Sequence, residues 1–450
     1  MKPTITRLAT TLAMLSQASH AAGFIEDSQA TLSLRNLYFN NDNRESQSER
    51  GKAAYNGQNE EWGQAFQLNL SSGFTQGTVG FGVDALGLLG VRLDSGGKAH
   101  KSYSDRTPGQ LFPLESDGSV VNQFSRLGLT AKAKVAHSEI RYGTLQTRLP
   151  VLVSNDGRLL PQTFEGSLIN SKDIDNLSLN AGLIERASGR SSSDRTGLAV
   201  SGASQESNHL WLAGADWTPK PGLLAQYYYA NLEDYYRQHF LGLTEQFTLN
   251  DLHSLKLDLR YFRTTADGAN ASSSGRAQGY RVGGYSHDGS GEIDNHTWSA
   301  ALTYSYGEHA LLAGYQQVSH NSAFVQANQG GLEGNKGAAG ASVYLLTDRQ
   351  IHNFTRAGER TAFAEYSYDF SALGAPGLKA SVAYLRGSNI QTASAGTQEE
   401  WERDFRLDYS LQSGPLKGLG LSWRNAALRG NAVADTDQNR LLVNYAIPLL

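Results

Sequence analysis

The sequence of 450 residues contains no cysteine and no long hydrophobic run. The absence of cysteine excludes the disulfide frameworks that stabilise many exported domains. No segment approaches the roughly 20 consecutive apolar residues that a membrane-spanning helix requires. The mean hydropathy of −0.42 is correspondingly polar. If this chain crosses a membrane, we do not expect it to do so with helices.

Sequence patterns of metal, nucleotide and hydrolase chemistry are missing as well. The 11 histidines are scattered and form no H-E-x-x-H or similar ligand spacing. The glycine-rich stretch "GTVGFGVDALG" belongs to no βαβ pattern of a nucleotide site. No arrangement of Ser, His and Asp indicates a nucleophilic enzyme. We therefore expect no catalytic residue, metal, cofactor or nucleic-acid partner.

The first residues have the features of a bacterial secretory signal peptide. Lys2 and Arg7 precede a short apolar run from Leu8 to Leu15, and Ser19-His20-Ala21 has the small-x-small pattern of a cleavage site. We expect residues 1–21 to be the signal peptide and residues 22–450 to form a single exported domain. No linker or change in composition marks a second domain.

Composition and export together favour a transmembrane β-barrel. The chain has 48 glycines and 21 tyrosines, and it is too long for one ordinary soluble core. A barrel shows the bilayer only every second residue, so its sequence stays polar on average. The predicted fold is therefore all-β, a closed antiparallel barrel that spans a membrane.

Apolar and polar residues alternate with a period of two in many segments, as in strands. In "RLGLTAKAKV" one face carries Leu127, Leu129, Ala131, Ala133 and Val135, and the other carries Arg126, Gly128, Thr130, Lys132 and Lys134. We expect the apolar face to contact lipid and the polar face to line the lumen. A soluble β-sandwich or solenoid also alternates, but it needs a dry interior, whereas here the second face is rich in Lys, Arg, Gln and Asn.

The spacing of these segments predicts 16 to 18 strands, which leave a water-filled channel. Short turns such as "SSGFTQG" and "SGPLKG" alternate with longer polar loops at 265–296 and 319–340. Aromatic residues that share the lipid face predict an interfacial belt: Tyr227, Tyr229, Tyr261, Trp298, Tyr366, Tyr368 and Trp423.

Cations on the lumenal face decide which solutes such a pore admits. They are Arg35, Arg126, Lys132, Lys134, Arg141, Lys256, Arg260, Lys379, Arg406, Arg424 and Arg440. Because the first strand closes on the last, we expect Arg35 beside Arg440, with Arg424 and Arg406 on the two preceding strands, as a basic wall that favours anions. The alternative is that lumenal carboxylates such as Asp84, Asp258 and Asp408 neutralise these cations.

Several long stretches resemble the OprD family of substrate-specific outer-membrane channels of pseudomonads. They are "AGFIEDS", "LRNLYFNND", "SGFTQGTVGFGVDALG", "GRLLPQTFEG", "LEDYYRQHF", "SGPLKGLGLSWR" and "DQNRLLVNY". The resemblance implies an 18-stranded barrel with a monomeric pore, either alone or in a loosely associated oligomer. It also implies an inward-folded third loop that narrows the channel, and a ladder of arginine and lysine for carboxylate-bearing solutes.

The resemblance assigns roles to particular residues. The segment from Pro150 to Gly166 matches the tip of the constriction loop, and Arg158, Arg35 and Arg424 match ladder positions. Tyr228 matches a tyrosine near the constriction. Ser422 and Ala383 stand where the family's amino-acid channel has arginines, and Arg406 and Lys379 are the candidate substitutes.

We therefore expect a passive outer-membrane channel for small carboxylates, with Arg126, Lys132, Lys134 and Arg440 completing the translocation set. Its partners are outer-membrane lipid and small organic acids or amino acids. One alternative is a channel for basic amino acids and related peptides, in which Asp348 supplies the acidic side. The other is a barrel enzyme of the outer membrane.

Overall fold

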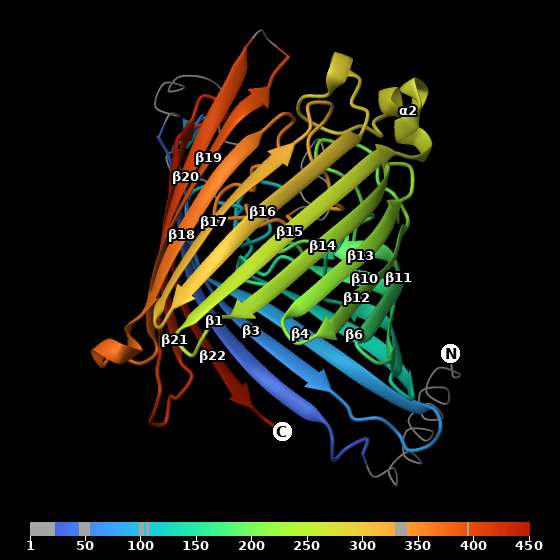
Figure 1. The fold of residues 1–450 in the computed structure, drawn as a ribbon, viewed down its shortest axis with the longest axis vertical. Coiled ribbons are helices and arrows are strands. Elements are labelled where there is room, and N and C mark those ends of the chain that lie inside the picture. The colour runs from blue at the N-terminus through green and yellow to red at the C-terminus, as the bar shows by residue number, and fades with distance from the viewer. Residues whose placement is uncertain (1–22, 45–54, 99–102, 105–107, 329–339, 394–395) are drawn as a thin grey trace.

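One closed antiparallel sheet of 18 strands forms the body of the protein (Figure 1). The computed structural model describes residues 23–44, 55–98, 103–104, 108–328, 340–393 and 396–450, and the expected signal peptide lies outside these ranges. The sheet closes because β1 pairs with the last strand, β22, as well as with β3. This confirms the predicted 18-stranded barrel.

The barrel strands follow one another around the wall in chain order. They are β1 (Gln29–Asn43), β3 (Gln58–Ser71), β4 (Gly80–Ser95), β6 (Gln123–Val135), β7 (Ser138–Leu145), β10 (Thr163–Ile174), β11 (Leu177–Ser188), β12 (Leu210–Lys220), β13 (Leu223–Leu232), β14 (Tyr236–Thr248), β15 (His253–Ala266), β16 (Asp294–Tyr306), β17 (His309–Val318), β18 (Arg360–Asp369), β19 (Leu378–Gln391), β20 (Thr397–Ser410), β21 (Gly420–Gly430) and β22 (Thr436–Pro448).

The connections at one end of the barrel are all short, and the longest connections lie at the other end. Short connections lie at the end where β1 begins and β22 ends, and one of them contains the 3-10 helix η5 (Phe370–Leu373). The long connections lie at the opposite end, where α2 is seen in Figure 1. They contain β2 (Tyr55–Asn56), β5 (Tyr103–Ser104), β8 (Arg148–Leu149), β9 (Leu152–Val153), η3 (Gly268–Ala271), α2 (Ser273–Gln278) and η4 (His287–Gly289).

Among the described residues, no helix is long and apolar enough to cross a membrane.

The outer face of the barrel is apolar, as the alternation predicts. Leu127 and Leu129 on β6 are 63% and 59% exposed on the outside, whereas Lys132 on the same strand is only 6% exposed. The aromatic residues Tyr227, Trp298 and Trp423 are also exposed. The period of two therefore sorts lipid-facing from lumenal side chains correctly.

The inner face is less uniformly polar than the sequence suggests. Leu37 and Phe39 point inward from β1, yet both are buried, in an apolar cluster with Leu159 and Leu160 of the connection 146–162. Larger and smaller clusters of the same kind lie against other parts of the wall. The expectation of a simple polar lining is wrong here, because connections that fold into the lumen bury apolar side chains against the wall.

Two glycines at the base of the connection 146–162 have backbone conformations that other residues rarely adopt. Gly143 on β7 and Gly166 on β10 lie opposite each other in the register, with φ angles of 139° and 156°. A Cβ atom on Gly143 would lie 2.0 Å from the carbonyl oxygen of Leu129, and one on Gly166 would lie 2.1 Å from that of Leu183. Both positions therefore require glycine.

We expect Leu159→Asp to loosen the connection 146–162 while the barrel stays closed. A carboxylate in this apolar cluster would be buried without a partner, which is strongly unfavourable, whereas the hydrogen bonds of the strands are untouched. Amide hydrogen exchange in peptides from 146–162 should rise by about tenfold or more, with unchanged gel mobility of the unheated protein. Leu416→Asp, at a leucine that is 48% exposed, should change neither. Unaltered exchange in Leu159→Asp would show that the cluster does not hold the connection.

Candidate functional site

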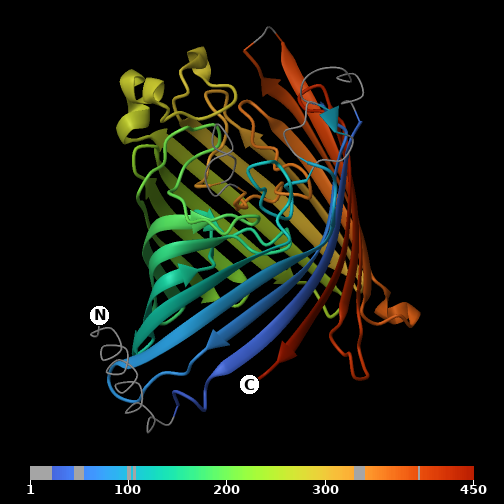
Figure 2. The same ribbon diagram turned by 180° about the vertical axis from the view of Figure 1, so that it is seen from behind.

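Lumenal carboxylates hold two of the connections inside the barrel. The carboxylate of Glu61 on β3 accepts hydrogen bonds from the backbone N–H groups of Gln110, at 2.5 Å, and Leu111, at 2.8 Å. Glu402 on β20 accepts from the N–H groups of Ile351 and His352, both at 2.8 Å. Figure 2 shows connections that pass through the interior of the barrel. Two consecutive N–H groups are thus satisfied by one carboxylate in each case.

Lumenal arginines bind the same connections through their carbonyl groups. The Arg126 guanidinium donates to the carbonyls of Pro161 and Gly189, at 2.5 and 3.0 Å. Arg260 donates to the Tyr344 carbonyl at 3.1 Å. These arginines are therefore structural anchors for the inward-folded connections.

Arg35 and Arg440 anchor the tip of the connection 146–162. Arg35 forms a bidentate ion pair with Asp156, at 2.7 and 2.8 Å, and donates to the carbonyl of Arg158 at 2.9 Å. Arg440 donates to the carbonyls of Gly157, at 3.3 Å, and Gln350. Arg440 therefore joins the connection 146–162 to the connection 319–359.

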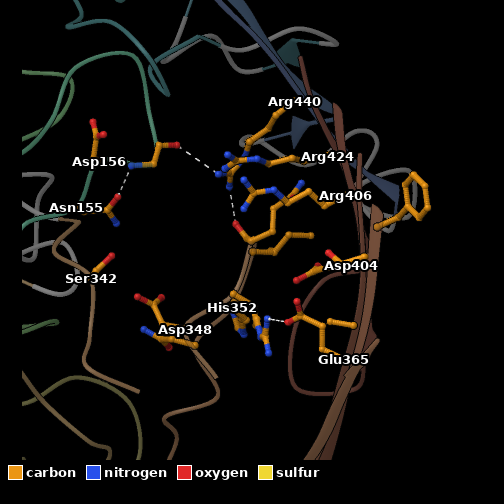
Figure 3. Close-up of a pocket in the computed structure, with 18 of the residues that line it drawn as sticks. Asn155, Asp156, Ser342, Asp348, His352, Glu365, Asp404, Arg406, Arg424 and Arg440 are labelled. Carbon is orange, nitrogen blue, oxygen red and sulfur yellow. Dashed lines mark hydrogen bonds and ion pairs between the residues drawn. The ribbon is translucent and has the colours of Figure 1, made fainter. Parts of the chain in front are cut away.

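A cavity of about 740 Å³ remains between these connections and the wall formed by β18 to β22. Figure 3 shows Asp156 and Ser342 from the connections facing Arg406, Arg424 and Arg440 from the wall. Its charged lining residues are Asp156, Arg158, Arg190, Asp348, Arg349, Glu365, Lys379, Asp404, Arg406, Asp408, Arg424 and Arg440. The connections 146–162, 189–209 and 319–359 all contribute to it.

The cations in this lining fall into two groups. Arg349 pairs with Glu365, Arg406 with Asp408, and Lys379 with Asp369. Within the described part of the chain, the other four form no ion pair: Arg158, Arg190, Arg424 and Arg440. We call these four the free guanidinium groups. An unpaired guanidinium beside a water-filled space is a binding group for carboxylate.

Arg158 is held by packing. Its guanidinium carbon lies 4.7 Å from the centre of the Phe39 ring, and its Nε atom is buried with no hydrogen-bond partner. Burial lowers the pKa of Arg158 well below its usual value, and the nearby charges of Arg440 and Arg190 lower it further. A guanidinium nevertheless remains a cation at neutral pH, so this charge is poorly neutralised by the protein.

Arg190 reaches the cavity from the connection 189–209. A Cβ atom on Gly340 would lie 2.7 Å from Nη2 of Arg190, so the absence of a side chain there makes room for this guanidinium. Burial lowers the pKa of Arg190 to about 10, and the negative charge of Asp348 opposes the shift.

Carboxylates line another part of the same cavity. Asp348 accepts a hydrogen bond from the N–H of Val343 at 3.1 Å. Burial raises the pKa of Asp348, while this hydrogen bond, Ser342 and the charges of Arg190 and Arg349 oppose the shift. Asp404 lies on the wall, and its Oδ1 atom is buried without a hydrogen-bond partner. The cavity therefore has cationic and acidic regions (Figure 3).

The structure brings most of the expected basic wall together. Arg406 pairs with Arg424 in the register of β20 and β21, and Arg424 pairs with Arg440 in that of β21 and β22. Arg35, however, pairs with Asn444, and Phe39 stands opposite Arg440. Arg35 thus lies on the strand next to that of Arg440, but four residues away from the position opposite Arg440.

Other residues predicted to bind solute lie elsewhere. Lys132 is buried against Asp84, at 2.6 Å, and Lys134 lies over the ring of Phe74. Tyr228 is fully buried and donates its hydroxyl hydrogen to Asp216 at 2.8 Å. None of these three lines the cavity, nor does Arg126.

The two positions that depart from the family pattern do line or approach the cavity. Ala383 is part of its lining, and the Ser422 hydroxyl accepts a hydrogen bond from Nε of Arg424 at 3.2 Å. Arg406 and Lys379, the candidate substitutes, also line the cavity, although each has a carboxylate partner.

The sequence did not single out Arg190, Arg349 or Asp404. Arg190 and Arg349 lie in connections, where no periodicity indicates the direction of a side chain. Asp404 shares the lumenal face of β20 with Arg406 and Asp408, and the period of two could have identified it.

Comparison with known proteins gives a consistent result. Residues 22–449 match the model of the OprD family of outer membrane porins. Porin D of Pseudomonas aeruginosa is 32% identical over 462 residues, which cover 99% of this chain and 96% of that protein. The porin-like protein GalP of Pseudomonas putida is 32% identical over 434 residues, with 96% and 94% covered.

Solved structures of Pseudomonas aeruginosa channels share the fold. OccK8 (OprE) is 48% identical with a TM-score of 0.85, and OpdK, solved with vanillate, is 35% identical with a TM-score of 0.81. Each alignment covers 95% of this chain and 100% of the other. The chain belongs to the OprD family, and it is a substrate-specific channel of the outer membrane and not an enzyme.

Proposed function

We propose that this channel takes up small carboxylate-bearing solutes by passive diffusion through the cavity between the inward-folded connections and the wall of β18 to β22. The observation that carries this proposal is the set of four free guanidinium groups in the lining, at Arg158, Arg190, Arg424 and Arg440. The structure of OpdK with vanillate supports it, because a relative that is 35% identical accommodates a small carboxylate.

The free guanidinium groups would replace the water that a carboxylate loses when it enters the narrow part of the channel. Each guanidinium can donate two parallel hydrogen bonds to one carboxylate. The groups lie on neighbouring strands and on the tips of connections, so a solute can exchange one guanidinium for the next without becoming fully desolvated. A volume of about 740 Å³ is sufficient for a small organic acid and its remaining water.

A channel for basic amino acids is the second candidate, because Asp348 and Asp404 could bind the cationic end of such a solute. The charge balance favours the first candidate. Seven Arg and Lys side chains and five Asp and Glu side chains of the described residues line the cavity, so positive charge is in excess. An anion lowers this excess, whereas an amino acid with a net positive charge increases it.

Uptake of benzoate and arginine through the same protein distinguishes the two candidates. In cells that lack their other porins, we expect this channel to accelerate benzoate uptake at low concentration more than arginine uptake. The opposite order would support the basic amino-acid channel. Equal, small accelerations of both solutes would indicate a pore without selectivity and would overturn both candidates.

We expect Arg158→Ala to raise the conductance of small ions and to weaken carboxylate binding. The substitution removes a bulky side chain from the tip of the connection 146–162 and one charge-assisted hydrogen-bond donor, which contributes about 1.5–3 kcal/mol, or about 10- to 100-fold in affinity. Single-channel currents and carboxylate uptake at low concentration measure the two effects. Arg158→Lys should restore uptake only partly, because lysine keeps the charge without the planar fork.

Arg424→Ala serves as the matched variant on the wall. It should weaken uptake with little change in conductance, because Arg424 lies on β21 and does not form the tip of a connection. If Arg158→Ala changed neither conductance nor uptake, the tip of the connection 146–162 would not be the narrow part of the channel.

The charge of Asp348 should make ion selectivity depend on pH. Because burial raises its pKa, Asp348 takes up a proton at a higher pH than an exposed aspartate, whose pKa is about 3.9. Protonation of Asp348 as the pH falls below neutral therefore removes negative charge from the cavity, and reversal potentials in a KCl gradient should shift toward chloride.

Asp348→Asn should show the chloride preference at neutral pH as well as at lower pH. His352→Gln is the necessary control, since His352 also lines the cavity and its side chain is ionisable. Loss of the pH dependence in His352→Gln alone would assign the effect to the histidine and contradict the role of Asp348.

A further inference from the structure

Three of the four free guanidinium groups gather at one place, the tip of the connection 146–162. A Cβ atom on Gly157 would lie 3.8 Å from Nη1 of Arg440 and 3.9 Å from Nη1 of Arg190. Arg158 is the next residue in the chain, and the guanidinium carbons of Arg158 and Arg440 lie over the same Phe39 ring, 4.7 and 5.7 Å from its centre. We call Arg158, Arg190 and Arg440 the tip cluster. No carboxylate of the described residues forms an ion pair with it.

Arg424 has different surroundings. It pairs with Arg440 in the register of the wall, but the two guanidinium groups point apart along it. Nε of Arg424 donates to Ser422 at 3.2 Å, whereas Nε of Arg440 donates to Gln438 at 2.7 Å, and Ser422 and Gln438 lie on opposite sides of this pair in the register. The lining thus offers a carboxylate two separate places to bind, one at the tip cluster and one at Arg424.

The total charge of the lining fits two anionic groups. The seven cationic and five anionic side chains of the described lining leave two positive charges uncompensated. One carboxylate would neutralise half of this excess. Two carboxylates on one solute would neutralise all of it, and they could occupy the two places at the same time.

Arg190 contributes one of these positive charges from outside the barrel strands. It comes from the connection 189–209, and it enters the cavity over Gly340, whose φ angle of 96° favours glycine. A guanidinium of this connection need not enter the cavity: the side chain of Arg195, which does not line it, is 55% exposed and pairs with Glu165 at 2.7 Å. Arg190 instead stays beside two other cations.

We infer that the tip cluster is a second anion-binding place, completed by Arg190, and that the channel selects solutes that carry two carboxylates. This inference rests on the proposed function, since it assumes that carboxylates pass through this cavity. In this inference, Arg190 is the residue that distinguishes dicarboxylates from monocarboxylates. Arg424 binds the other carboxylate, which both kinds of solute possess.

Block of the single-channel current by succinate and butyrate tests the inference with two solutes of equal carbon number. In the wild-type channel, succinate should block half of the current at a concentration about tenfold lower than butyrate does, the effect expected of one additional charge-assisted contact. Arg190→Gln should raise the half-blocking concentration of succinate about tenfold and change that of butyrate little. Arg190→Lys should fall between Arg190→Gln and the wild type.

Arg195→Gln is the matched control, because it removes the same charge from the same connection outside the cavity. It should leave both half-blocking concentrations unchanged. The inference is overturned if succinate and butyrate block the wild type equally, or if Arg190→Gln weakens both to the same extent. It is also overturned if inorganic phosphate blocks as strongly as succinate, because one compact dianion would then suffice. If neither organic acid blocks and neither is transported, the proposed function itself fails.

Discussion

The interior of this barrel depends on one constraint, which is that every backbone N–H and C=O group brought into the lumen needs a hydrogen-bond partner. Connections that fold inward leave the regular ladders of the sheet, so the wall must supply partners through side chains. Glu61 and Glu402 each accept from two consecutive N–H groups, while Arg126, Arg260 and Arg440 donate to carbonyls. Much of the lumenal charge is therefore part of the structure.

This use of charge explains how the cavity obtains its free cations. A guanidinium that donates to carbonyl oxygens is held in place without being neutralised, because a carbonyl carries only a partial charge. Arg440 is the clearest case, since it joins two connections through Gly157 and Gln350 and has no carboxylate partner among the described residues. Arg35, which forms a bidentate pair with Asp156, is fixed as firmly but contributes little net charge. Anchoring a connection and compensating a charge are thus separate effects of the same residue type.

The period of two in the sequence predicted much of the fold. It separated the lipid-facing Leu127 and Leu129 from the lumenal Lys132, and together with the chain order of the strands it placed Arg406, Arg424 and Arg440 on adjacent strands. It could not show what covers a lumenal residue. Tyr228 has lumenal parity, yet it is fully buried among apolar residues that include several from the connections.

For a related reason, the path of the connections could not be predicted from the sequence. Outside a strand, neighbouring residues have no fixed alternation, so the direction of Arg190 or Asp348 depends on contacts between distant segments. The segment after residue 340 looked like the return to a strand, but it runs through the lumen and lines the cavity as far as Asn353. Only the resemblance to a known family identified the inward course of the connection around Arg158, and it did so for that connection alone.

The apolar clusters and the uncompensated charge of the cavity are linked physically. Like charges at the tip of the connection 146–162 repel one another, and this repulsion would push Arg158 and the backbone at Gly157 away from Arg440 and Arg190. Leu159 and Leu160 follow directly in the chain, and they are fully buried against the wall with Leu37 and Phe39. Their burial opposes the repulsion, so the free energy of apolar packing keeps the cations together. A selective site of this kind requires a stable wall behind it, and the alternation of the strands supplies that wall.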